Sequence, residues 1–138
     1  MNLEECFAKR LLVRVTKDAE NASRSLQISR DYLADAARNN EIGCYKVVLI
    51  LCYTSMFHAA RALLFRDGVK ERSHLCIPVY VRAQYPDLER LANLLDSYRE
   101  LRHGVFYRMG ISVDEGEAAE ALRSARGFLS RIETIVGV

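Results

Sequence analysis

The chain has 138 residues, half of them hydrophobic, and a formal net charge of +2. That length suits one domain with a real core and is too short for two ordinary domains, and the apolar content excludes a disordered chain. The net charge is too weak to indicate a general nucleic-acid-binding surface, so any anionic partner has to be bound locally.

Nearly the whole sequence has the apolar spacing of helices, and no stretch shows a convincing strand alternation. A first short helix is expected over Leu3–Val15. Thr16 is the expected N-cap of a second helix, which runs to about Asn39 and buries Leu26. A central helix is expected at about Ile42–Arg66. Apolar residues cover most of its girth, so it should be buried on several sides.

Ser73 is the expected N-cap of a shorter fourth helix, which Pro78 should kink or restart. A fifth helix is expected over about Asp87–Tyr107, and Asp114 should cap a last one. The inward positions of the fifth helix are Leu88, Leu91, Leu94, Leu95 and Leu101. The predicted fold is a single all-α domain over residues 1–138, an antiparallel bundle of four principal helices plus one or two short helices.

The cysteines and histidines complete no metal-binding spacing. The four cysteines are Cys6, Cys44, Cys52 and Cys76, and no C-x-x-C pair occurs among them. We therefore expect four reduced thiols, no metal and no cofactor. The longest apolar run, Val47–Phe57, is too short to span a bilayer, and the acidic first residues do not read as a signal peptide. We expect a soluble, cytoplasmic protein without a membrane partner.

The most informative segment is residues 96–108, which holds three arginines, one histidine and two tyrosines at helical spacing. Arg99, His103 and Tyr107 follow one another at i, i+4 and i+8, so they lie on one face, and Arg102 flanks them. Asp96, three residues before Arg99, is placed to pair with it and orient its guanidinium. A basic, aromatic helix face of this kind is typical of a contact with phosphate or with another subunit.

Two plainer interpretations stay open. The segment is equally consistent with a solvated helix face that carries one core tyrosine. The chain also has 16 arginines and only 4 lysines. That bias suits phosphate contacts and interfaces, but codon usage in a GC-rich genome would produce it as well.

Gly104 costs about 1 kcal/mol inside a helix, a cost that a close approach of a second backbone would explain.

Two stretches resemble a known family. Residues 53–64, reading YTSMFHAARALL, look like the central helix of HEPN domains, and Gly68 and Ser73-His74 follow where that family places them. The stretch Arg102–Tyr107 is similar to the family's active motif, an arginine followed a few positions later by histidine or tyrosine. The resemblance covers roughly Leu26–Ile132.

The resemblance implies a homodimer whose paired motif helices form a cleft. It also implies a role with RNA or nucleotides, as a metal-independent endoribonuclease of a toxin–antitoxin system or as the companion of a minimal nucleotidyltransferase. Arg102 would then stabilise charge on the phosphate, His103 would be the acid–base residue, and Tyr107 would hydrogen-bond or protonate an oxygen. Asp96 and Arg99 would bind and orient the set. Tyr107 stands where the nuclease members carry histidine, so a non-catalytic interaction module whose arginines serve the dimer contact is the alternative.

The two remaining histidines are given structural roles. His58 follows an apolar run and is expected to hydrogen-bond inside the bundle or at a dimer contact. His74 follows the expected Ser73 cap and is interpreted as a helix-start residue rather than a ligand.

Overall fold

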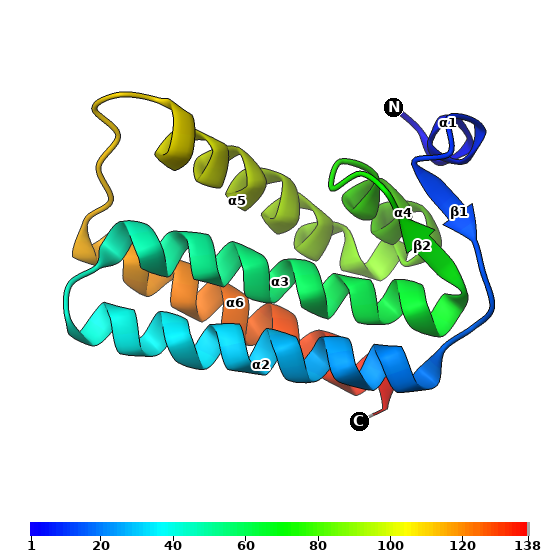
Figure 1. Ribbon diagram of the computed structural model, residues 1–138, viewed down its shortest axis with the longest axis horizontal. Helices are drawn as coiled ribbons and strands as arrows, with labels where there is room; N and C mark the ends of the chain where they lie inside the picture. The colour runs from blue at the N-terminus through cyan, green and yellow to red at the C-terminus, as the bar shows by residue number, and fades with distance from the viewer. Residues whose placement is uncertain (138) are drawn as a thin grey trace.

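The computed structural model describes residues 1–137, and they form an antiparallel helical bundle (Figure 1). Within these residues the elements are α1 (Leu3–Ala8), β1 (Leu12–Arg14), α2 (Ala19–Glu41), α3 (Tyr45–Asp67), β2 (Val69–Glu71), α4 (Cys76–Gln84), the 3₁₀ turn η1 (Pro86–Leu88), α5 (Glu89–Tyr107) and α6 (Glu115–Val136). The predicted all-α class is confirmed, with four long helices and two short ones. The expectation that the chain forms no strands is wrong in one place, because β1 and β2 form a two-stranded antiparallel sheet.

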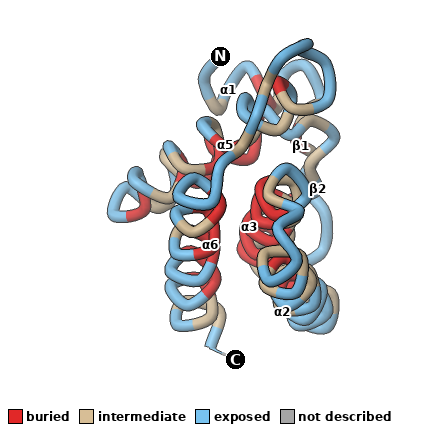
Figure 2. The backbone as a smooth tube through the Cα atoms, turned by 90° about the vertical axis from the view of Figure 1, so that its left-hand side faces the viewer, coloured by how far each residue is buried: buried red, intermediate tan, exposed pale blue. Residues whose placement is uncertain are grey.

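The central helix α3 is the core of the fold. It packs against α2 and α6 on one side and against α5 on the other, and Figure 2 shows buried residues concentrated along it. By length and composition alone α3 would reach across a membrane, but 61% of its most apolar window is buried inside the bundle. Burial of that kind is typical of the central helix of a helical bundle.

A buried pair of serines holds α2 and α3 close together. The Ser29 hydroxyl donates to the carbonyl oxygen of Ser55 at 2.7 Å, and the Ser55 hydroxyl donates to the carbonyl oxygen of Ser29 at 2.8 Å. The small side chains permit the close approach, and each hydroxyl is satisfied inside the interface.

Two predicted helix boundaries are corrected by the structure. The first helix ends at Ala8 rather than Val15, because the chain then extends into β1 and pairs with β2. The second helix is capped by Asp18, whose Oδ1 accepts from the Asn21 amide at 2.9 Å, and not by Thr16. The first outcome depends on β2, which lies outside the segment. The second depends on Asp18, a better hydrogen-bond acceptor two positions after Thr16.

The region around α4 and α5 also differs in detail. The helix α4 begins at Cys76, and the Ser73 hydroxyl accepts from the Leu75 amide at 3.3 Å without capping the helix. Pro78 is therefore the third residue of α4, in the first turn, where proline removes no helical hydrogen bond and no kink is needed. Leu101 was expected to face inward and is 48% exposed. The predicted cap of the last helix is confirmed, since Asp114 forms a capping box with Glu117.

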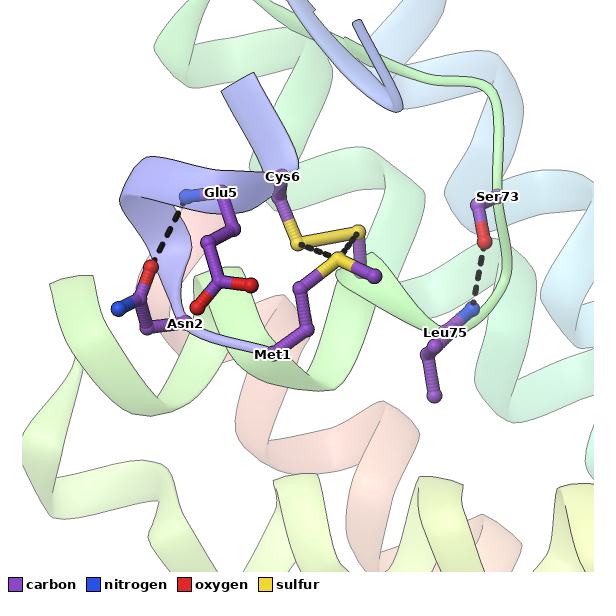
Figure 3. The surroundings of a disulfide bond; sticks show 7 residues. Met1, Asn2, Glu5, Cys6, Ser73 and Leu75 are labelled. Carbon is purple, nitrogen blue, oxygen red and sulfur yellow. Dashed lines mark hydrogen bonds between the residues drawn. A yellow bond between two sulfur atoms is a disulfide. The ribbon is translucent and has the colours of Figure 1, made fainter. Parts of the chain in front are cut away.

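The prediction of four free thiols is wrong for two cysteines. Cys6 of α1 and Cys76 of α4 form a disulfide across 70 residues of sequence (Figure 3). The pairing arises because α1 packs on the start of α4, a long-range contact that cysteine spacing does not reveal. Cys44 and Cys52 are free; Cys52 is buried as expected of a core thiol, and Cys44 is exposed.

Candidate functional site

Asp96 anchors the basic face of α5. Its Oδ1 accepts from Arg99 Nη2 at 3.2 Å, which is the pair that the spacing predicts. Its Oδ2 accepts from Arg82 Nη2 at 2.7 Å, a contact from α4 that the spacing of α5 does not contain. The carboxylate therefore holds two guanidinium groups, ties α4 to α5 and sets the orientation of Arg99.

Arg102 turns toward the bundle. Its guanidinium carbon lies 5.6 Å from the centre of the Tyr53 ring on α3 and 5.3 Å from the centre of the Phe106 ring. Cation–π contacts of this kind contribute about 0.5–1 kcal/mol each at partly exposed sites. Arg102 is thus half-buried and lies against two aromatic rings.

His103 and Tyr107 lie together on the outer part of α5. Their ring centres are 4.7 Å apart, as expected for residues one turn apart. Both side chains are exposed, Tyr107 to 75%. The predicted stripe is therefore divided: the His103 ring contacts the Tyr107 ring at a tilt, while Arg99 is bound to Asp96 one turn earlier.

Gly104 is buried, yet nothing within residues 1–137 crowds it. A Cβ built there would meet only the Arg108 side chain, at 3.7 Å, which is an ordinary contact. No close backbone approach inside the single chain explains this glycine.

A hollow of about 880 Å³ opens beside α5 and gathers most of the predicted site residues. Its lining residues are His74, Ser97, Arg99, Glu100, Leu101, Arg102, His103 and Arg108. Three arginines therefore face it against one glutamate, and two histidines join them. Tyr107 lies beyond the hollow in contact with His103, and Asp96 lies behind Arg99. This arrangement favours an anionic ligand.

His74 lines the hollow as well, although sequence reasoning gave it only the role of a helix-start residue. It lies in the connection between β2 and α4, where its Nδ1 is 3.0 Å from the Tyr53 hydroxyl and its ring centre is 4.1 Å from that of Phe57. Partial burial against these rings, with the charges of Arg102 and Arg99 and then Arg61, lowers the pKa of His74 below its usual value. No local spacing predicts its position, because the loop meets α3 and α5 only through packing.

His58 has a structural environment, as expected, but a different one from that predicted. Its ring stacks on Tyr32 of α2 at 5.7 Å and meets the edge of Phe57 at 5.2 Å. Its buried Nδ1 has no hydrogen-bond partner within residues 1–137, so the predicted internal hydrogen bond is not made by that atom. Burial, with Arg61 and His74 nearby, lowers the pKa of His58 to about 4.

Comparison with known proteins adds one finding. The family model described as HEPN domain matches residues 22–135, most of the chain. No curated protein matches the sequence.

Proposed function

Because the chain belongs to the HEPN domain family, whose members are generally associated with nucleotides or RNA, we propose that it binds RNA or a nucleotide in the hollow beside α5. We place it in the cytoplasm, in a toxin–antitoxin or nucleotidyltransferase-linked system. The observation that carries the proposal is the lining of the hollow, with three arginines against one glutamate. Arginine forks bind phosphate oxygens in a bidentate manner, which suits a phosphodiester.

The chemistry that this set of residues supports best is metal-independent cleavage of RNA. The ribose 2′-oxygen attacks the adjacent phosphorus while His103 takes its proton. The bond from phosphorus to the 5′-oxygen then breaks, and the leaving oxygen receives a proton, for which Tyr107 is the donor. Arg102 stabilises the extra negative charge on the phosphate during this step, an effect of several kcal/mol in a site that excludes water.

We further propose that the chain works as a homodimer. Within one chain, Arg102 contacts Tyr53 of α3 while Tyr107 faces solvent outside the hollow, and a second α5 packed here would bring both types of group to one phosphate. Large apolar side chains are also exposed at the end of α5 and just after it, at Leu101, Phe106, Tyr107 and Met109. A second copy would cover them. Sedimentation at micromolar concentration should give twice the 15.7 kDa monomer mass, and a clean monomer would remove the shared cleft.

The test of activity is RNA cleavage by the purified protein in excess chelator. Arg102→Ala should abolish cleavage and Tyr107→Phe should slow it strongly. Arg123→Ala is the matched control, because Arg123 lies on α6 and pairs with Glu120. Cleavage that needs added metal, or that survives Arg102→Ala unchanged, would refute the mechanism.

The alternative is a non-catalytic interaction module whose arginines serve the dimer contact. Two observations favour it: the exposed apolar residues around Tyr107, and a tyrosine in the position where the nuclease members carry histidine. In that case the parent cleaves no RNA, and Arg102→Ala weakens the dimer. A neighbouring reading frame with the Gly-Ser and paired-aspartate pattern of a minimal nucleotidyltransferase would support the two-component role, and co-purification of the two chains would test it.

A further inference from the structure

The side chain of His74 is held in place from two sides. The Tyr53 hydroxyl lies 3.0 Å from Nδ1, and the Phe57 ring lies against the imidazole at 4.1 Å between centres. Both partners come from α3, the most deeply buried helix of the bundle. An exposed histidine held this way, at the edge of a hollow, is already ordered before any ligand arrives.

The hydrogen bond to Tyr53 determines which nitrogen of His74 carries the proton. Burial raises the pKa of Tyr53 to about 12, so its phenol stays protonated near neutral pH. When the phenol is the donor to Nδ1 of the neutral imidazole, the single ring proton sits on Nε2. The nitrogen that is left for a ligand is thus a hydrogen-bond donor and not a base.

Positive charge surrounds this donor. The groups that act on His74 are Arg99 and Arg102 from α5 and Arg61 from α3, with His58 behind it. Phosphate oxygens are the natural acceptors for such a set, since they take hydrogen bonds from guanidinium and imidazole groups together.

We propose that His74 is a phosphate-binding residue: its Nε2–H donates to an oxygen of the same phosphate group that Arg99 and Arg102 bind, and Tyr53 is the positioning residue that fixes this tautomer. The ligand class is a phosphodiester or phosphomonoester of a nucleotide. The inference rests on the proposed function for the location of the ligand, and it requires no cleavage. It assigns a site role to the loop between β2 and α4 as well as to α5.

Protonation of His74 should be linked to binding. A bound phosphate brings negative charge to the ring and favours the imidazolium, which typically raises a pKa by about one unit or more at contact distance. Binding should therefore become tighter as the pH falls, and for a one-unit rise the gain approaches roughly tenfold once the pH lies below the pKa of His74 in the free protein. His103 lines the same hollow, so its contribution has to be separated.

Nuclear magnetic resonance of the ¹⁵N-labelled histidine rings in the full-length chain separates them. The probe is a short RNA with 2′-O-methyl groups, which cannot be cleaved through its 2′-oxygen. Without the probe, the nitrogen shifts of His74 should report the Nε2–H tautomer. With saturating probe, its pKa should rise by about one unit. A His74 pKa that does not move while the parent binds the probe would overturn the inference.

Binding of the same probe by variants completes the test. His74→Leu should bind about tenfold more weakly at pH 6 and should lose most of the pH dependence, as expected for one lost charge-assisted hydrogen bond. Tyr53→Phe should keep binding but mix the two tautomers of His74, whereas Tyr45→Phe, a tyrosine at the start of α3, should change neither. If Arg102→Ala abolishes binding and His74→Leu binds like the parent, the inference fails and the proposed function stands. If the parent binds no probe, both fail.

Discussion

The disulfide between Cys6 and Cys76 makes a quantitative prediction about stability. The bond closes a loop of 70 residues, which in the chain-entropy treatment restricts the unfolded chain by about 4 kcal/mol. Replacing both cysteines by serine should therefore lower the free energy of unfolding by about 4 kcal/mol. The double variant is the proper comparison because it leaves neither Cys6 nor Cys76 as an unpaired buried thiol.

Urea denaturation of the oxidised parent and the double variant measures this difference. With a denaturant slope of about 2 kcal/mol per molar, the midpoint should fall by roughly 2 M. Adding a reductant to the parent should reproduce most of the shift, and Cys44→Ser, at an exposed free thiol, should leave the midpoint unchanged. A double variant within about 0.5 kcal/mol of the parent would refute the reasoning and would restore the expectation of four independent thiols.

Three further predictions concern the bundle itself. Burial keeps the pKa of His58 near 4, against an ordinary value of 6.5, so the unfolded chain binds the proton more strongly than the folded one. Stability should therefore fall as the pH drops from 6.5 to 4, by up to about 3 kcal/mol, and His58→Leu should remove that part of the slope in denaturation measured across this range. Gly68→Ala should lower the free energy of unfolding by more than about 2 kcal/mol in thermal denaturation, because φ is +79° and a Cβ would lie 2.6 Å from a backbone carbonyl oxygen. Gly43→Ala, with φ +76° and open space, should lower it by only about 1 kcal/mol, and equal losses would contradict the steric argument. Ser29→Ala and Ser55→Ala should each lower the free energy of unfolding by about 1 kcal/mol. Because their hydroxyls are 3.0 Å apart, a double-mutant cycle should show a coupling energy of about 0.5 kcal/mol or more, and strict additivity would contradict a shared network.

The parts of the fold that follow from sequence are those that local signals determine. The capping box of Asp114 and Glu117 lies within four residues, so it marks the start of α6 whatever surrounds it. The strands β1 and β2 escape prediction because each has three residues, and they exist through the pairing of Leu12 with Glu71 and its neighbours. Strands this short carry too few side chains to show a period.

The candidate site divides in the same way. The ion pair of Asp96 with Arg99 follows from their spacing of three on one helix, and the contact of His103 with Tyr107 follows from a spacing of four. The second guanidinium on Asp96 comes from Arg82, 14 residues earlier on another helix, and no periodicity points to it. The same holds for His74, which reaches the hollow only because α3 and α5 pack on either side of its loop.

The uneven burial of α5 has a consequence for the free energy at which its two halves open locally. The described residues of this helix are buried at Ala92, Leu95 and Tyr98, but in the nine residues that follow only Gly104 is buried. The first half is thus held by the core, while the last turns depend mainly on their own backbone hydrogen bonds. Segments with so few buried contacts open at a small fraction of the global unfolding free energy, and their amide hydrogens exchange with solvent through that local opening. A second copy of the chain or a nucleic acid that binds there must stabilise the closed form of these turns, so part of its binding free energy is spent on ordering them. Binding should therefore slow the hydrogen exchange of the amides of residues 99–107.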